Sequence, residues 1–359
     1  MSGQTVTGQL YVDDPAIVFK GKRPEAMQGL DLLLSWWMAL GIPLAWAKGA
    51  VYEGAVAHSW IGVVFTPQED GSVLMELPVK FLAEFREQLV PFCRVEGGQP
   101  LKCAEQLVGR AGRIAYVVPA ARPFVAGLYA ALAASKRDIG RGKSRSQGRV
   151  VPVRRFASAA AWLRALVDGD TTALFPLQRK VFPGGPKRAS TSSWTAQFDA
   201  STTGGGAVLR DGRRIVEYFA VQWQDEEVSL IGVHVADSKF QSFWELLTVL
   251  LVLLLWGDDF TDTELAIVGD STSALQDALH LKGSGEMAAV AREIAWRQVR
   301  RGWSFDVGHL PAERNVIPDA LSRLWDDPPL QLPEFALREA TRRQAPHVGS
   351  VWRAVAFPK

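Results

Sequence analysis

Two different patterns of hydrophobic and polar residues follow each other between Trp194 and Leu324. Three short segments ending in polar turns have the partial alternation of strands, and an Asp211-Gly212 pair predicts a hairpin between the second and third. After them, long apolar runs suited to helices alternate with short apolar runs typical of buried strands. The predicted strands are Thr195–Phe198, Gly204–Arg213, Arg214–Trp223, Leu265–Gly269 and Trp303–Val307; the predicted helices are Phe240–Trp256, one capped by Ser271 and running to His280, Gly285–Arg301, and one beginning near Asn315.

This order predicts an α/β fold, in which a mixed sheet of three antiparallel strands is followed by alternating helix and strand. Its most apolar segment, Leu246–Leu255, lies between Glu245 and the pair Asp258-Asp259. Ten residues are too few to span a bilayer. We therefore expect a buried core helix and no membrane partner.

Four acids lie where an apolar element meets a polar turn, or project from an apolar helix: Asp199, Glu245, Asp270 and Asp319. Such carboxylates suit a hard-oxygen site for Mg²⁺ or Mn²⁺, because unpaired acids in a cluster need a cation to neutralise them. Each also has an ordinary interpretation. Asp199 can cap a turn, Asp270 the following helix, Asp319 can lie on a solvated face, and Glu245 can pair with Arg or Lys.

The four acids occur within recognisable surroundings. They are the opening Phe198-Asp-Ala-Ser201, Glu245 within a helix, Asp270-Ser271 at a strand end, and Asn315-x-x-x-Asp319-Ala-Leu-Ser-Arg323. In this order they resemble a retroelement ribonuclease H domain. The resemblance implies cleavage of the RNA strand of an RNA–DNA hybrid, with Asp199, Glu245, Asp270 and Asp319 as ligands of two Mg²⁺ ions, or of Mn²⁺. It also makes His309 a catalytic candidate, for which packing or surface exposure is the alternative.

The hybrid would be recognised by contacts to 2′-hydroxyl groups in its shallow minor groove. Ser201, Thr202 and the run Gly204-Gly205-Gly206 are candidates for a close backbone approach to that groove, with a plain tight turn as the alternative.

The first part of the chain opens with a strand, an acidic turn and a strand between Leu10 and Phe19. Its turn, Tyr11-Val12-Asp13-Asp14, resembles the catalytic turn of reverse transcriptases; a solvated Asp-Asp turn is the alternative. The segments after it resemble the end of a palm and a helical thumb or connection region. They are a helix Pro24–Leu40, a hairpin of Trp60–Phe65 with Val73–Leu77, helices Pro78–Val90 and Lys102–Tyr116, and a helix opened by Arg122.

The segment that resembles a polymerase lacks part of the expected catalytic set. No acid precedes Tyr11, although the family carries a further catalytic aspartate on an upstream strand. We therefore expect the residues Tyr11, Asp13 and Asp14 to be vestigial and RNA-directed DNA polymerase activity to be missing. The absent upstream half of a polyprotein is a candidate partner.

We divide the chain into residues 1–134 (partial palm and thumb-like region), 135–192 (basic linker and connection), 193–326 (ribonuclease H-like domain) and 327–359 (tail). The segment Ser135–Arg149 is basic and rich in Gly and Ser, which predicts either a solvated loop or a phosphate-contacting patch. The tail is expected to be partly helical around Pro333–Arg343.

Composition narrows the class of protein. Apolar residues make up 48% and charged residues 22% of the 359 residues, which is typical of a globular chain. The net charge is +2, so any affinity for nucleic acid must come from local patches. The cysteines, Cys93 and Cys103, and the polar first residues indicate an intracellular protein that is not secreted.

Three functions remain open at this stage. The first is a metal-dependent ribonuclease H from a retrotransposon reverse transcriptase. The second is a catalytically inactive remnant that folds and binds nucleic acid. A transposase or integrase nuclease fits less well, because such sites typically use three acids and the Asn315–Arg323 ending would go unexplained.

Overall fold

The computed structural model describes residues 5–11, 14–20, 22–43, 49–51, 56–141, 149–169, 177–181, 193–260, 265–332 and 334–353. Contacts along the backbone divide the chain into two units. Residues 1–76 and 180–183 form the first unit, and residues 77–179 and 184–359 form the second. The expected domain boundaries at residues 134, 192 and 326 remain a prediction.

The first unit begins with the expected hairpin. Strands β1 (Thr5–Tyr11) and β2 (Asp14–Lys20) pair antiparallel, and Tyr11 faces Asp14 in the register. Asp13, the other residue predicted for the polymerase turn, lies outside the described residues. Helix α1 (Arg23–Ala39) follows, as predicted.

A second sheet of the first unit has the order β3-β4-β5-β8, with β3 (His58–Trp60), β4 (Val63–Pro67), β5 (Val73–Glu76) and β8 (Gln178–Val181). The predicted hairpin is confirmed by the antiparallel pairing of β4 with β5, but the expectation of one continuous strand over Trp60–Phe65 is wrong. Ile61 and Gly62 both have positive φ, of 44° and 75°, so the chain reverses there and β3 pairs with β4. Two consecutive residues with positive φ make the tight hairpin turn that suits the twist of the strands.

A helical segment opens the second unit. Helices α2 (Val79–Leu89), α3 (Leu101–Val117), α4 (Arg122–Gly140) and α5 (Ala157–Asp168) pack through their apolar faces, and a short ribbon of β6 (Gly98–Pro100) with β7 (Val150–Pro152) joins them. The basic linker predicted from Ser135 begins later than expected, because α4 continues to Gly140. Ser135 is buried and its hydroxyl donates to the carbonyl of Ala131 at 2.8 Å, so this polar residue fits the helix.

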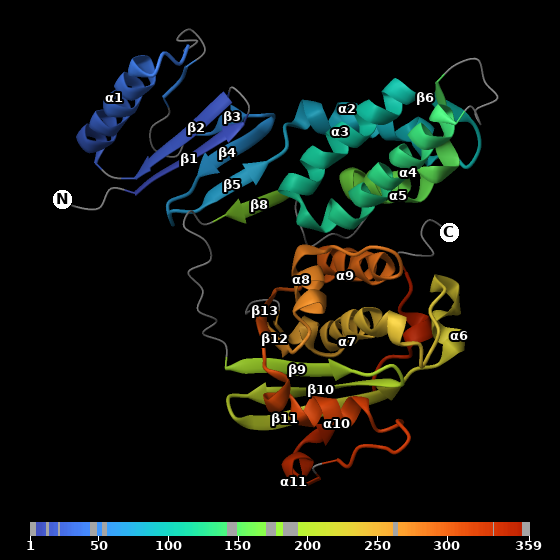
Figure 1. Ribbon diagram of the computed structural model, residues 1–359. Helices are drawn as coiled ribbons and strands as arrows, with labels where there is room; N and C mark the ends of the chain where they lie inside the picture. Colours follow the sequence, from blue (N-terminus) through green and yellow to red (C-terminus); the bar gives the residue numbers. More distant parts are fainter. Residues whose placement is uncertain are drawn as a thin grey trace. The chain divides into compact units, whose positions relative to one another are not determined.

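The rest of the second unit is built on a six-stranded sheet of order β13-β12-β9-β10-β11-β14 (Figure 1). β9 (Trp194–Ala200), β10 (Gly204–Asp211) and β11 (Arg214–Gln222) are antiparallel, whereas β12 (Leu265–Gly269) runs parallel to β9 and β13 (Phe305–His309) parallel to β12. The predicted mixed α/β sheet is therefore confirmed. β13 begins and ends two residues later than predicted, which places His309 inside the strand.

Helices cover both faces of this sheet. α7 (Gln241–Trp256) packs across β9 and β10, with α8 (Thr272–His280) and α9 (Met287–Arg301) beside it, while α10 (Val316–Ser322) packs on the other face (Figure 1). The helical segment Ser238–Phe260, which contains α7, is long and apolar enough to be considered for a membrane span, but 72% of its 18-residue apolar window is buried inside the protein. The expectation of a core helix is confirmed.

The tail differs from the predicted helix. Its helical part is the single turn α11 (Glu334–Leu337), after which β14 (Thr341–Arg342) pairs parallel with β11. Leu337 packs with Val208, Ile215 and Leu321 in a small core beneath α10. Arg343 binds both carboxylate oxygens of Glu217 on β11, at 2.9 and 3.0 Å. These contacts hold the tail as a sixth strand at the sheet edge.

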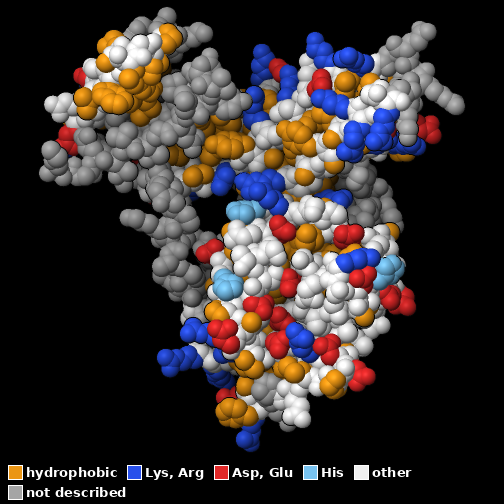
Figure 2. Space-filling view, in the orientation of Figure 1, with side chains coloured by type: hydrophobic (Ala, Val, Ile, Leu, Met, Phe, Trp, Pro, Cys, Tyr) orange, Lys and Arg blue, Asp and Glu red, His pale blue; other side chains and the backbone are white. Residues whose placement is uncertain are grey.

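Charge is distributed unevenly along the second unit. Between Leu77 and Gly169, sixteen Lys and Arg residues stand against six Asp and Glu; between Ser193 and Arg353 fifteen stand against twenty-three. Figure 2 shows Lys and Arg side chains gathered over the helical segment, and acidic and basic side chains interspersed over the sheet-based part. The nearly neutral chain therefore contains one strongly basic segment.

Candidate active site

The sheet brings two of the predicted acids to one edge. Val268 on β12 lies beside Gln197 on β9, so the residues two positions further on, Asp270 and Asp199, stand level at the carboxyl ends of neighbouring parallel strands. Side chains two apart on a strand share a face, which places both carboxylates on one side of this edge. The predicted strand-end acids are therefore brought together by register alone.

Asp199 is the most enclosed of the four acids. Its side chain is only 7% exposed, and its Oδ2 accepts a 2.7 Å hydrogen bond from the hydroxyl of Ser322. The pKa of Asp199 is raised from 3.8 to about 7, mainly by burial; the hydrogen bond from Ser322 lowers it, and the charges of Asp270 and Asp319 add to the rise. The nearby positive charge of Arg323 also lowers the pKa of Asp199, but it offsets the effect of burial only in part.

Glu245 is held from both sides. Gln241, one turn earlier on α7, donates to Oε1 at 3.3 Å and to the carbonyl of Ala200 at 2.6 Å, and the hydroxyl of Ser271 donates to Oε2. Burial raises the pKa of Glu245, and the charge of Asp270 adds to this, while both hydrogen bonds lower it. These neutral donors fix the carboxylate without supplying the Arg or Lys partner that was the alternative.

Asp319 projects from α10 and is half exposed. Its Oδ1 accepts a 2.6 Å hydrogen bond from Arg323 Nε, and the same guanidinium lies 3.8 Å from Asp326. The hydrogen bond to Asp319 raises the pKa of Arg323 above its ordinary value. Of the four predicted acids, Asp319 is therefore the one whose charge already has a cationic partner, supplied by the residue that follows its own helix.

His309 has no comparable link. It lies on β13 beside Gly269, is exposed, and within the described ranges forms no hydrogen bond or ion pair with the four acids. Its predicted catalytic role therefore gains no support from a contact, and it remains a prediction based on the resemblance.

Two further side chains serve the site without having been assigned a role from the sequence. Ser322 reaches Asp199 across 123 residues of chain, and Asn315 donates from Nδ2 to the carbonyl of Phe198 at 2.9 Å. Both are buried, and Asn315 Oδ1 has no hydrogen-bond partner. Asn315 and Ser322 both belong to the motif Asn315-x-x-x-Asp319-Ala-Leu-Ser-Arg323, but the spacing of the motif alone did not reveal which of its side chains point inward.

The glycine run beside the site has a structural explanation. A Cβ at Gly204 would meet Trp325, one at Gly205 would meet Trp223 and Thr248, and one at Gly206 would lie 2.3 Å from Leu321. All three glycines are buried. Close packing between β10 and the helices on both faces requires these glycines, so the expectation of a groove-contacting backbone is not supported.

Ser201 is likewise part of the framework. Its hydroxyl donates to the carbonyl of Ser322 at 2.9 Å, and its own carbonyl accepts from the indole of Trp223 at 3.0 Å. Thr203 donates to Asp326 at 2.5 Å. This network ties the β9–β10 turn to the end of α10.

The donor set fits a divalent cation. Four carboxylates are hard-oxygen ligands, and two of them have pKa values raised by burial. The buried Asn315, whose Nδ2 donates to the carbonyl of Phe198, the residue before Asp199, has an amide oxygen without a hydrogen-bond partner. The side chains as they stand do not converge on one point, because the described residues contain no group of three His, Cys, Asp or Glu positioned to hold a metal ion. Arg323 instead neutralises Asp319.

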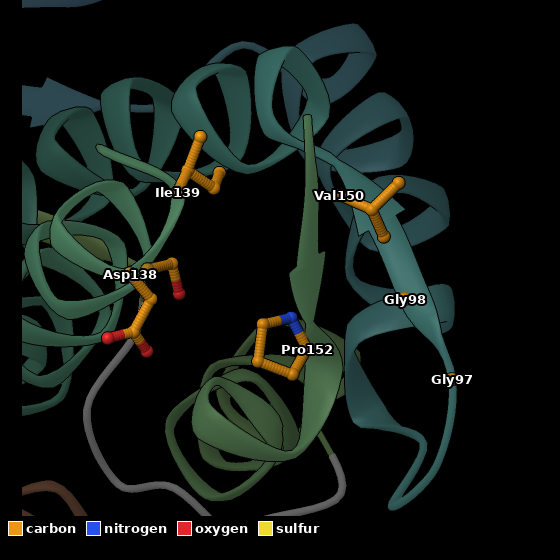
Figure 3. A pocket seen from close by; sticks show the side chains of 7 residues that line it. Gly97, Gly98, Asp138, Ile139, Val150 and Pro152 are labelled. Carbon is orange, nitrogen blue, oxygen red and sulfur yellow. The ribbon is translucent and has the colours of Figure 1, made fainter. Parts of the chain in front are cut away.

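A separate cavity lies elsewhere in the second unit. It has a volume of about 300 Å³ and lies between the β6–β7 ribbon and the end of α4, lined by Gly97, Val150, Pro152 and Asp138 among others (Figure 3). None of the predicted site residues lines it, and Asp138 is paired with Arg155 at 2.6 Å. The cavity and the four acids are therefore separate features of the second unit.

The sequence matches no protein-family model and no curated protein. Among solved structures, the chain is similar to an RNase H1 from the halophilic archaeon Halobacterium salinarum, with 19% identity over 38% of this chain and 98% of that chain and a TM-score of 0.28. It is also similar to a foamy viral protease-reverse transcriptase, solved with double-stranded DNA and with an RNA/DNA hybrid. The identities there are 11% and 12%, the coverages 84% and 86% of this chain, and the TM-scores 0.34 and 0.32.

The chain spans 46% and 36% of those two foamy viral chains. At such identities and TM-scores the likeness assigns neither a family nor an activity. The functional conclusion therefore depends on the contacts around the acids themselves.

Proposed function

We propose that this chain is a metal-dependent endonuclease that cleaves the RNA strand of RNA–DNA hybrids and derives from a retrotransposon reverse transcriptase. The observation that carries the proposal is Asp199, a buried carboxylate at a strand end whose pKa is raised to about 7 by burial and by Asp270 and Asp319. Keeping such a residue costs stability, which is typical of an active site.

Asp199, Glu245, Asp270 and Asp319 would hold the cations. Two Mg²⁺ ions, or Mn²⁺, would supply activation of the attacking water and stabilisation of the leaving 3′-oxygen. The residues of the chain position the carboxylates: Ser322 holds Asp199, while Gln241 and Ser271 hold Glu245. Donors of this kind orient metal ligands and are needed for full affinity.

The basic helical segment supports a nucleic-acid substrate. Arg94, Arg149 and Arg154 are exposed around the β6–β7 ribbon, in the part of the chain where basic residues greatly outnumber acidic ones. Contacts to phosphate from such side chains displace counterions and make affinity fall with salt. The acidic part of the second unit would repel a phosphate backbone unless cations neutralised its carboxylates.

The test is cleavage of a hybrid labelled on each strand by the purified chain, in Mg²⁺ and in EDTA. We expect metal-dependent cutting of the RNA strand, with Asp199→Asn and Asp270→Asn reducing the rate at least about a hundredfold while hybrid binding is retained. Asp306→Asn is the matched control, because Asp306 is an exposed acid on the neighbouring strand β13. Cleavage by Asp199→Asn at the wild-type rate would refute the proposal.

The Arg323–Asp319 ion pair favours one second candidate, a protein that binds nucleic acid without cleaving it. In such a protein the arginine would take the place of the cation permanently. Hybrid binding that falls with salt, is unaffected by EDTA and is accompanied by no cutting in Mg²⁺ or Mn²⁺ would select this function over the nuclease.

A further inference from the structure

Two consecutive residues at the end of α10, Ser322 and Arg323, bind two different carboxylates of the candidate site, those of Asp199 and Asp319. Ser322 is fully buried and donates from Oγ to Asp199 Oδ2 at 2.7 Å. Its backbone carbonyl is fixed in turn by the hydroxyl of Ser201 at 2.9 Å. The hydroxyl of Ser322 also lies 2.9 Å from the carbonyl of Asp319, a second acceptor within the same helical turn. Asp199 is therefore held by a donor that carries no charge.

Arg323, the next residue, binds a different acid in a different way. Its Nε lies 2.6 Å from Asp319 Oδ1, and both side chains are partly exposed, at 47% for Arg323 and 37% for Asp319. A second acid, Asp326, lies 3.8 Å from the guanidinium. An exposed ion pair of this type is worth little free energy and can be exchanged for another partner.

We propose that this end of α10 sets the divalent-cation affinity of the site, with Ser322 strengthening it and Arg323 weakening it. The inference rests on the proposed function, since it concerns the same four carboxylates. It adds a positioning residue for Asp199 and an internal competitor for the cation at Asp319.

Ser322 and Arg323 have opposite expected effects on cation affinity because the serine is neutral and the arginine is positively charged. Ser322 occupies one oxygen of Asp199 with a neutral hydrogen bond, which orients the carboxylate and leaves its full negative charge and its second oxygen for a cation. Arg323 brings a positive charge to Asp319, so a divalent cation must displace it or bind beside it. Removing the hydroxyl should therefore loosen the cation, and removing the guanidinium should tighten it.

The experiment is calorimetric titration of the full chain with Mn²⁺ alone and with Mg²⁺ alone, at low and at physiological salt. We expect Ser322→Ala to bind about tenfold to a hundredfold more weakly, as for other residues that orient metal ligands. We expect Arg323→Gln to bind roughly threefold to tenfold more tightly, with a smaller gain at higher salt. Arg338→Gln is the charge control, because Arg338 is an exposed arginine just beyond α11, and it should match the wild type.

Thermal unfolding without metal separates positioning from folding. Ser322→Cys keeps the size of the side chain and a weak donor, so it should recover part of the affinity lost in Ser322→Ala. If Ser322→Ala does not fold, the cysteine variant and Arg323→Gln decide the question. A merely structural serine would lower the melting temperature without changing the cation affinity of the folded protein, and that result would overturn the proposal.

The titrations also distinguish failure of this inference from failure of the proposed nuclease function. A wild-type chain that binds cations, together with an Arg323→Gln affinity equal to or weaker than wild type, would overturn this inference and leave the nuclease proposal standing. A wild-type chain that binds no divalent cation would overturn both.

Discussion

The hydroxyl of Ser271 makes two hydrogen bonds with different roles. It donates to Glu245 Oε2 and accepts from the backbone N–H of Ala274. The second bond caps the first turn of α8, as the sequence predicted. The first reaches across to α7 and fixes a carboxylate of the candidate site. One side chain therefore couples the start of a helix to the orientation of a proposed metal ligand.

Replacing Ser271 tests both tasks together. We expect Ser271→Ala to lower the free energy of unfolding by about 1–2 kcal/mol through loss of the cap and of the partly buried hydrogen bond to Glu245. It should also reduce cleavage at subsaturating Mg²⁺ by about tenfold. Urea denaturation and a Mg²⁺ titration of the cleavage rate measure the two effects. Ser271→Thr, which keeps the hydroxyl, should stay close to wild type in both; equal losses in the two variants would contradict this role.

The raised pKa of Asp199 predicts that the metal-free protein becomes less stable as pH rises. Its pKa is raised from 3.8 to about 7, mainly by burial, so between these values the folded state keeps a proton that the unfolded chain has released. The contribution of this proton to stability is full below about pH 4 and is lost as pH rises through 7. We expect the free energy of unfolding to fall by about 2–4 kcal/mol between pH 5 and pH 8 in EDTA.

The variant Asp199→Asn should remove most of that slope and be more stable than wild type at pH 8, although it cannot cleave. Glu245, whose pKa is also raised by burial, leaves a smaller slope of the same sign. Urea unfolding at pH 5, 6.5 and 8 measures it, with Asp306→Asn as the control that keeps the wild-type slope. Identical slopes in wild type and Asp199→Asn would show that Asp199 is not the group responsible.

Gly206 should tolerate no side chain. A Cβ there would lie 2.3 Å from Leu321 Cβ and 3.0 Å from the backbone of the same residue, so α10 would have to move away from β10. We expect Gly206→Ala to destabilise the protein by about 2–3 kcal/mol or more. Chemical denaturation measures the loss.

The matched control is Gly109→Ala in α3. A Cβ at Gly109 meets nothing within 4 Å, and the residue is exposed, so alanine should stabilise the helix by about 0.5–1 kcal/mol. Opposite signs for the same chemical change are the expected result. A stable Gly206→Ala protein would mean that α10 is not seated against β10 as described.

Arg343 should anchor the sixth strand. It binds both oxygens of Glu217, which also accepts from the indole of Trp256 at 2.8 Å. We expect Arg343→Gln to cost about 1 kcal/mol of stability and to speed hydrogen exchange of the amides from Thr341 to Arg343. Arg338→Gln should leave the exchange unchanged. Unaltered exchange in Arg343→Gln would mean that β14 is held by other contacts.

The sequence predicted what depends on periodicity and on residues at element ends. Strands that finish in Asp199 and Asp270 meet at one edge because neighbouring parallel strands end together, and the apolar run of α7 had to be buried. Both features are local in the sequence. They were sufficient to predict the mixed sheet and the meeting of Asp199 with Asp270 at its edge, whereas a shared metal site of all four acids stays a prediction.

Contacts between distant side chains were not predictable in the same way. The hydrogen bond from Ser322 to Asp199 and the place of Gln241 between Glu245 and Ala200 depend on how α10 and α7 are rotated on the sheet. The positive φ of Ile61 also escaped prediction, since an isoleucine rarely adopts it. These features depend on packing, which the alternation of polar and apolar residues does not encode.

The position of α10 in the chain has a consequence for protein synthesis. Ser322 follows Asp199 by 123 residues, and it is translated after every other element that supplies a predicted ligand. Chains are made from the amino end, and domains fold as units once they are complete. While the ribosome still holds α10, the nascent chain has neither Asp319 nor the side chains that hold Asp199 in place. The contacts that position Asp199 are therefore among the last that the chain can form during synthesis.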